Sequence, residues 1–476
     1  MNLRRSLKNA NCGFILTGQF QNFIASCILF CCPGIYLAVT GLGAGGGHPS
    51  AFHLADVTNT LLYALYSVFG WCGGPLLKFV GPRWALAIGA TGYPIYISGL
   101  WYYDRTGKQG FTIFTGAYLG VAAAFLWSAA AYVGLAYSCL HQKSQFISIQ
   151  WSILALGSTV GSFIAFGLNY RSKSNGVPGA VYIIFIVIMF MAVLLATFLM
   201  KDPSSVKKSD GSSALPPKET KFLQEFKGLL TAAKDWRLLA LLPAAFASQS
   251  TVPWQTHLNS YYFSLRTRSL NNVLYWCIQL FLPHLLTAIL DTKRFRRINR
   301  GLFGLSIQAV ILIVTFSGEL SWIIKNKIDL HQTSPNLDWS DPGYGKAIVL
   351  YMLMGAQYST CVISLQWCVS LVVNDPTMYA SYAGLYKGTT AAGLCVSFGI
   401  DAAGVSFRNQ AIIYLVLMIV LSVSQLSITV LCGNSPSLPE DDFSKPPLVI
   451  EGFDYPQNSN SSSFNSDKKK ELESSL

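Results

Sequence analysis

Charged residues are scarce in this sequence. Asp, Glu, Lys and Arg make up only 12% of the 476 residues, while hydrophobic residues make up 52%. Soluble proteins carry about 25% charged residues, so this composition excludes a soluble globular protein. Apolar runs of about 20 residues recur along most of the chain, and each is long enough to cross the hydrocarbon core of a bilayer as a helix. We therefore predict a multi-pass membrane protein in a lipid bilayer.

Patterns that hold metals, cofactors or catalytic groups are also lacking. The 11 cysteines lie mostly inside apolar runs without zinc-type spacing, so we expect free thiols. The glycines of Gly41-x-Gly43-x-x-Gly46 match a dinucleotide-binding pattern, but they follow an apolar span where that fold requires a strand. No Ser/His/Asp, Cys/His or paired-carboxylate set stands out. We predict no cofactor, no metal site and no enzymatic activity.

Carboxylates are missing from the middle of every apolar run. Asp56, Glu319, Asp375 and Asp401 all fall near the ends of such runs. Acidic residues inside a membrane often mark proton relays. The sequence therefore gives little support for proton coupling through a buried acid.

The net charge is +12 at pH 7, a value that can indicate nucleic-acid binding. However, the lysines and arginines lie in the loops between apolar runs instead of along one face. About 23 of the 34 fall in the N-terminus, in alternate loops and in the tail, and the side of a membrane richer in Lys and Arg is normally cytoplasmic. We predict that both termini are cytoplasmic and that nucleic acid is not a partner. The residues fit the plasma, vacuolar and endoplasmic reticulum membranes equally well.

A polar run divides the apolar sequence into two halves of nearly equal length. It extends from Lys201 to Arg237 and is rich in Pro, Ser and Lys, so it is too polar to lie in lipid. We predict four regions, namely a six-helix bundle over 1–200, a cytoplasmic linker over 201–237, a second six-helix bundle over 238–432 and a disordered cytoplasmic tail over 433–476. The twelve predicted spans are 13–40, 55–77, 84–103, 111–139, 145–168, 179–200, 238–263, 271–290, 302–324, 347–373, 379–400 and 411–432.

Two six-helix halves joined by a long basic loop suggest the major facilitator architecture, in which two bundles rock about a site near the middle of the membrane. The predicted seventh span, 238–263, is interrupted by Pro253 and polar residues. An interrupted helix is tolerated where its freed polar groups face protein or a watery cavity. We therefore expect a broken seventh helix.

A motif between the second and third spans is similar to a loop of the major facilitator superfamily. The segment GGPLLKFVGPRW, residues 73–84, matches the pattern at Gly74, Leu76, Gly81 and Arg83, but Lys78 stands at its acidic position. The resemblance implies that this loop helps latch the two bundles together.

The second half carries a segment that could complete such a latch. Asp291, at the corresponding position, is followed by basic residues. The latch candidates are therefore Gly74, Lys78, Gly81, Arg83 and Asp291. A merely basic cytoplasmic loop is an equally good interpretation.

Six further stretches resemble the uncoordinated-93-like family, specifically its fungal-type members. They span both halves in the family's order and include YAGLYKGTTAAG, while the segment YSCLHQK, residues 137–143, departs from the family pattern. The resemblance implies a major facilitator fold. The matching stretches are residues 33–46, 81–101, 125–137, 263–276, 290–295 and 382–393.

Lys387 is the leading candidate for a substrate-binding residue. It lies about nine residues into its predicted span, which places it roughly 13 Å deep, near the midplane. A lysine at that depth costs about 2.5 to 3.5 kcal/mol. We expect it to face the bundle interior, where it lines a cavity or meets a structural partner such as a backbone carbonyl.

Other polar residues within spans are secondary candidates, with helix packing as the alternative. Pro33-Gly34 should kink the first span and free a carbonyl there. The family resemblance also singles out Arg266 and Arg268 in an outer loop, where guanidiniums could bind a carboxylate, a phosphate or lipid headgroups. The secondary substrate-binding candidates are Gln19, Asn22, Asn59, Trp127, Gln150 and Gln366.

Two functions are compatible with these observations. One is a secondary transporter that moves an unknown small solute by alternating access. The other is a non-transporting partner that regulates a channel or escorts another membrane protein, as the resemblance to animal members of the family implies. A membrane-embedded enzyme is disfavoured because no catalytic set is present.

Overall fold

The computed structural model of this protein describes residues 14–42, 52–139, 142–169, 179–214, 222–290, 292, 294–330, 334–373 and 378–433. These residues are helical, with isolated β-bridges and no named strand among them. The elements are α2 (Gly18–Leu29), the π-helix η1 (Phe30–Gly34), α3 (Ile35–Gly41), α4 (Phe52–Trp71), α5 (Gly73–Val80), α6 (Pro82–Thr106), α7 (Gln109–Ala136), α8 (Lys143–Asn169), α9 (Gly179–Phe198), the 3₁₀ helix η5 (Pro203–Ser205), α10 (Phe222–Lys234), α11 (Trp236–Ala247), α12 (Val252–Tyr262), α13 (Leu265–Leu290), α14 (Arg297–Lys325), α15 (Tyr344–Val372), α16 (Tyr379–Ala402) and α17 (Phe407–Cys432).

Each predicted span coincides with one helix or with a set of consecutive helices. In the described part of the chain, eight helical segments are long and apolar enough to cross a membrane, or nine if α4 and α5, bent by 74°, form one span. The helices α6 and α16 and the short helices α11 and α12 fall outside this group. The predicted all-helical membrane fold is confirmed, and the count of twelve spans stays a prediction.

Proline and glycine explain the breaks in the first and seventh spans. Pro33 lies inside η1, where the missing N–H removes one helical hydrogen bond. A Cβ on Gly34 would lie only 2.9 Å from the carbonyl oxygen of Leu154 in α8, so this position needs glycine. The seventh span divides into α11 and α12, and Pro253 stands in the first turn of α12. Both predicted irregularities are therefore present.

Glycine also makes the sharp turn between α5 and α6. Gly81 has a φ of +80°, a conformation that a residue with a Cβ rarely adopts. Pro82 follows as the first residue of α6, where its lack of an N–H costs nothing. Gly81 and Pro82 therefore form the turn between the end of α5 and the start of α6.

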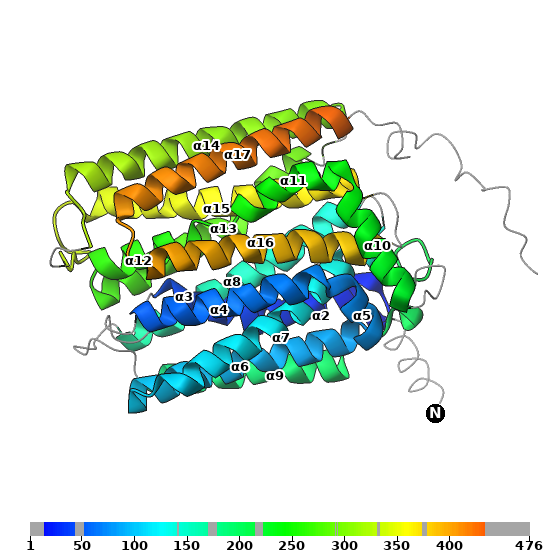
Figure 1. The fold of residues 1–476 in the computed structure, drawn as a ribbon, viewed down its shortest axis with the longest axis horizontal. Coiled ribbons are helices and arrows are strands. Elements are labelled where there is room, and N and C mark those ends of the chain that lie inside the picture. The colour runs from blue at the N-terminus through cyan, green and yellow to red at the C-terminus, as the bar shows by residue number, and fades with distance from the viewer. Residues whose placement is uncertain are drawn as a thin grey trace, which may run out of the picture. The chain divides into compact units, whose positions relative to one another are not determined.

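The helices of the two halves lie side by side, with α2–α9 on one side and α11–α17 on the other (Figure 1). The principal contacts between the halves join α4 to α16 and α8 to α13. In the α4–α16 pair the backbones meet closely, because a Cβ on Gly70 would lie 3.0 Å from the Cα of Gly388. The space between the halves is therefore enclosed by helices from both.

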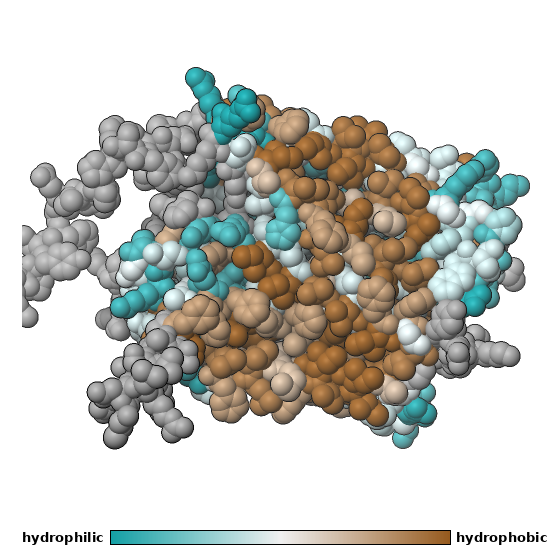
Figure 2. Space-filling model, turned by 180° about the vertical axis from the view of Figure 1, so that it is seen from behind, coloured by the Kyte–Doolittle hydropathy of each residue, from teal (hydrophilic) through white to brown (hydrophobic). Residues whose placement is uncertain are grey.

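The outer surface matches a lipid environment. A broad apolar band lies between hydrophilic regions on the face turned away from Figure 1 (Figure 2). Large apolar side chains on α9, α14 and α17 are exposed, among them Val187, Phe190, Val310 and Val423. Such a continuous apolar surface suits the hydrocarbon core of a bilayer. The protein is a multi-pass integral membrane protein.

Part of the predicted linker is ordered against the helices. Lys207 donates its N–H to the carbonyl of Leu16 at 2.9 Å, and its own carbonyl accepts the N–H of Gly18 at 2.8 Å. The helix α10 packs against α5 and α16. We call this side of the bundle the linker end and the side with α12 and residues 334–343 the far end. The predicted disordered tail over 433–476 lies, apart from Gly433, outside the described residues.

Candidate functional site

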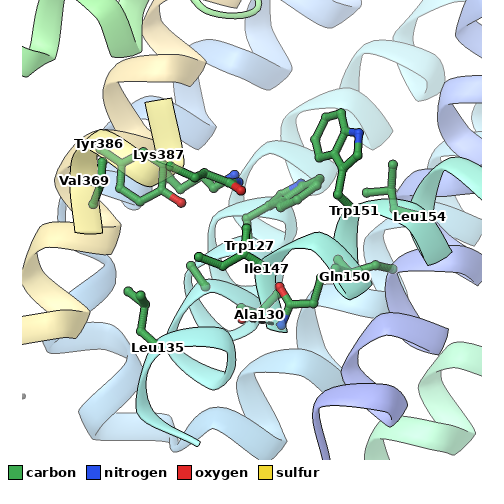
Figure 3. Close-up of a pocket in the computed structure, with 13 residues that line it drawn as sticks. Trp127, Ala130, Leu135, Ile147, Gln150, Trp151, Leu154, Val369, Tyr386 and Lys387 are labelled. Carbon is green, nitrogen blue, oxygen red and sulfur yellow. Dashed lines mark hydrogen bonds between the residues drawn. The ribbon is translucent and has the colours of Figure 1, made fainter. Parts of the chain in front are cut away.

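Lys387 lies in α16, between the two halves. Its side chain extends toward Trp127 of α7 (Figure 3), and the Nζ atom is 4.7 Å from the centroid of that ring and 5.3 Å from that of Tyr386. The residue is only 6% exposed. Within the described part of the chain its ammonium group makes these ring contacts and has no hydrogen bond or ion pair. It is therefore a buried cation without a counter-ion among the described residues.

Two adjoining pockets meet at this lysine. The first, which we call the lower pocket, holds about 540 Å³ of empty space, and the second, the aromatic pocket, about 610 Å³. Four residues line both: Trp127, Trp151, Leu154 and Lys387. Both volumes include space that is open to solvent. The aromatic pocket takes its name from Tyr36, Tyr63, Tyr66, Tyr93, Trp127, Trp151 and Tyr358.

Two smaller pockets extend this space toward both ends of the bundle. A pocket of about 320 Å³ shares Leu37 and Tyr358 with the aromatic pocket. Another of about 280 Å³ shares Ile147 and Gln366 with the lower pocket. The four pockets therefore form a row between the halves, with Lys387 near the middle of the row.

Amide contacts join the halves at the far end. Asn272 of α13 donates to the carbonyl of Ala38 and to the hydroxyl of Ser162, both at 2.9 Å. Asn259 of α12 donates to the carbonyl of Gly41 at 3.1 Å. These bonds join α12 and α13 directly to α3 and α8.

Hydroxyl contacts join the halves toward the linker end. Ser148 and Thr287 share a hydrogen bond of 2.7 Å, and Ser152 and His284 share another of 2.7 Å. All four lie on α8 and α13. Polar contacts therefore join the two halves both at the far end and toward the linker end.

The other predicted substrate-binding residues take three kinds of position. Trp127, Gln150 and Gln366 line the lower pocket together with Lys387. Asn22 lies behind this group, where its Oδ1 accepts a hydrogen bond from Gln150 Nε2 at 2.8 Å. The fold brings these residues together, and their spacing in the sequence does not predict that they meet.

Two further candidates lie away from the pocket lining. Asn59 accepts hydrogen bonds from the hydroxyls of Tyr36 at 3.1 Å and Tyr96 at 2.9 Å, and so orients a ring of the aromatic pocket. Gln19 contacts Ser209 of the linker at 3.5 Å. It belongs to the linker end and not to the pocket.

The outer-loop arginines have local partners. Arg266 binds Asp338 through two hydrogen bonds, of 2.7 Å from Nε and 2.5 Å from Nη2, and its guanidinium lies 5.3 Å from the centroid of the Trp339 ring. The hydrogen bonds from Arg266 hold the pKa of Asp338 well below its usual range. Arg268 is 3% exposed and donates to the hydroxyl of Ser260 at 3.1 Å. Neither arginine lines one of the four pockets.

The described latch candidates all lie in the first half, but they contact different halves. Gly74 faces the second half, because a Cβ there would lie 3.1 Å from the Cα of Ser381 in α16. Arg83 instead donates to the carbonyl of Thr197 in its own half, at 2.6 Å. Gly81 makes the turn described above, and Lys78 lies in the last turn of α5. Asp291 lies outside the described residues.

A buried polar cluster at the far end was not predicted. Asp401 of α16 is 3% exposed, and its Oδ1 contacts His257 Nδ1 and accepts from Gln410 Nε2, both at 2.8 Å. Its Oδ2 has no hydrogen-bond partner among the described atoms. The sequence places Asp401 near a span end, where exposure is the usual expectation. The interrupted seventh span, which carries His257, was the one available signal.

A second unpredicted contact lies at the linker end. Asp235 caps α11, and its carboxylate accepts hydrogen bonds from Arg237 Nη2 at 2.8 Å and from the hydroxyl of Tyr382 at 2.6 Å. Burial alone would raise the pKa of Asp235, but the hydrogen bonds from Arg237 and Tyr382 outweigh it and leave this pKa below its usual value. The start of the second half is thereby fixed to α16.

Known proteins share the sequence and the fold. A family described as "Ion channel regulatory protein UNC-93" matches residues 57–250. An uncharacterized membrane protein of Schizosaccharomyces pombe is 68% identical over 88% of this chain and 86% of its own length. UNC93-like protein 1 of Arabidopsis thaliana is 34% identical over 81% of this chain and 84% of its own.

Among solved structures, the fucose:proton symporter FucP of E. coli is similar with a TM-score of 0.55 and 14% identity, over 85% of this chain and 98% of that one. At this identity the likeness concerns the fold, which is that of the major facilitator superfamily. The predicted fold class and family resemblance are confirmed. The chain belongs to the UNC-93 family.

Proposed function

We propose that this protein is a secondary transporter that moves a small solute across a membrane by alternating access. The observation that carries the proposal is the row of pockets between the two halves, with a buried lysine near its middle that has no hydrogen bond or ion pair among the described residues. A site at the interface of two helical bundles is where such transporters bind their solutes. In this proposal residues 1–200 and 238–432 are the two bundles, 201–237 is the linker, and both termini are cytoplasmic.

The contacts between the halves are of a kind that can break and reform. Asn272, Asn259 and Ser148 make neutral hydrogen bonds across the interface, each with a net contribution of about 0.5 to 1.5 kcal/mol. Opening one end therefore requires the loss of a few weak bonds that water can replace. In the proposed cycle the far-end amide contacts open while the contacts nearer the linker end hold, and then the reverse.

Reconstitution in liposomes tests this proposal. Wild-type protein should accumulate at least one solute from a broad panel under an ion or solute gradient, and Lys387→Ala should reduce that uptake about 100-fold because the central cation is lost. Lys346→Ala, at an exposed position at the start of α15, is the matched control and should transport normally. An absence of uptake and of ligand-induced thermal stabilisation across the panel would overturn the proposal.

A second candidate is a non-transporting partner that regulates a channel or escorts another membrane protein. The description of the matching family as an ion channel regulatory protein favours it. It predicts that a membrane protein co-purifies in a fixed ratio in gentle detergent. Repeated isolation of a lone monomer would argue against it.

A further inference from the structure

The charges that line the two pockets indicate the sign of the charge on a ligand. The residues that line the lower and aromatic pockets include Lys387 and, in the described part of the chain, no Asp or Glu. Burial of a lysine in a membrane span is unfavourable. The cation–π contacts with Trp127 and Tyr386 offset part of that cost, and an anion beside Nζ would offset the rest.

The same balance argues against a cationic ligand. Cations bind aromatic faces, and the ammonium of Lys387 already lies over the ring of Trp127. A second positive charge in the same enclosed space would meet a like charge at short range, without a carboxylate to balance either. A cation is thus the least favourable occupant.

The remainder of the lining indicates the body of the ligand. Aromatic rings from α3, α4, α6, α7, α8 and α15 surround the aromatic pocket. Planar rings pack against such faces in offset or edge-on arrangements.

Few polar groups line the two pockets, and they are not all engaged. The Nε2 of Gln150 donates to Asn22 and to the carbonyl of Ala130, whereas Trp151 Nε1 and Gln366 Oε1 have no hydrogen-bond partner among the described atoms. One donor and one acceptor therefore lie near the ammonium of Lys387, which supplies the partner for a negatively charged group.

We propose that the Lys387 pocket binds small organic anions with a planar aromatic body, the carboxylate beside Lys387 and the ring in the aromatic pocket. The transport of such anions rests on the proposed function. Binding does not, because it is measured on purified protein without a gradient.

A matched set of four compounds tests the inference by isothermal titration calorimetry on the full-length protein in nanodiscs. Indole-3-acetate carries the ring and the negative charge, indole-3-acetamide has the same ring without charge, tryptamine has the ring with a positive charge, and acetate has the charge without the ring. We expect indole-3-acetate to bind at least tenfold more tightly than each of the other three. Equal affinity for the amide, tighter binding of tryptamine, or no binding of indole-3-acetate would overturn the inference.

Variants assign the selectivity to the lysine. Lys387→Met should reduce indole-3-acetate binding to the level of the amide while leaving amide binding unchanged, and Lys387→Arg should retain at least part of the preference for the anion. The exposed Lys346→Met should bind as the wild type does. If Lys387→Met binds the amide normally and keeps wild-type affinity for the carboxylate, the inference is wrong.

The outcome is distinguishable from that of the proposed function. Selective binding of indole-3-acetate without uptake under any gradient would support the anion site and count against transport. Uptake confined to neutral or cationic solutes would support transport and overturn the anion site.

Discussion

Two cations singled out in the sequence have opposite surroundings in the structure. Arg266 lies at the far end, 42% exposed in its side chain, and is held by both oxygens of Asp338. Lys387 lies between the halves and is 6% exposed, and the described groups that contact its charge are aromatic rings. The paired cation fastens a loop to the start of α13, whereas in the proposed function the cation without a described counter-ion interacts with a ligand. The partner, more than the charge, separates a structural residue from a candidate binding residue.

The variant with the largest expected effect on this comparison is Lys387→Met. Removal of the buried charge should abolish anion binding and raise the free energy of unfolding by about 1 kcal/mol, because the burial cost exceeds the cation–π gain. Thermal unfolding followed with a thiol-reactive dye measures the change, since the cysteines of the described chain are buried or half-buried. A clear loss of stability would show that Lys387 is a structural residue and would break the contrast.

Asp338→Asn should have the opposite sign. It removes a carboxylate that Arg266, Ser264 and Thr267 all contact, and we expect the free energy of unfolding to fall by about 1 to 2 kcal/mol, a modest value because Arg266 is partly exposed. Binding at the distant Lys387 pocket should stay within twofold of wild type. An unchanged melting temperature would mean that the pair contributes nothing measurable.

The pH dependence sharpens the same comparison. Since the pKa of Asp338 is lower in the folded protein than in the unfolded chain, its contribution is fully present above the unfolded pKa of about 3.9 and is lost as the pH falls below that value. The stability difference between wild type and Asp338→Asn should therefore be constant from pH 7 to about pH 5 and shrink below about pH 4. A difference that grew on acidification would contradict the assignment.

The smallest expected effect concerns Arg268, a buried cation outside the pockets. It donates to Ser260 and has no carboxylate among its described partners. Arg268→Met should change the affinity for indole-3-acetate less than twofold, because the residue does not line the cavity. A large loss of affinity would mean that burial of a cation alone, without a cavity beside it, contributes to the site.

Hydropathy and helix length were sufficient to locate the helices. The apolar runs matched helices such as α14 and α17, and Pro33 and Pro253 marked the two irregular spans. Depth in a span was also sufficient to select Lys387, because a charge near the midplane must face the protein interior.

The sequence did not predict which residues contact one another across the fold. Arg266 meets Asp338 across 72 positions and His257 meets Asp401 across 144. Nothing local in the chain records such a pairing, and periodicity assigns a face to a residue without assigning a neighbour. Gln19 shows that polarity within a predicted span does not by itself place a residue at the pocket, because this side chain lies beside the linker.

The glycine contact between α4 and α16 has a kinetic consequence. A Cβ on Gly388 would lie 2.7 Å from the backbone nitrogen of Trp71 and 2.9 Å from the carbonyl oxygen of Ser67, both in α4. Gly388 directly follows Lys387 in the chain. In the proposed transport cycle, the residue beside the ligand and the residue at the close approach of the halves are therefore joined by one peptide bond. A methyl group added at Gly388 should then change the rate of conformational exchange more than the affinity.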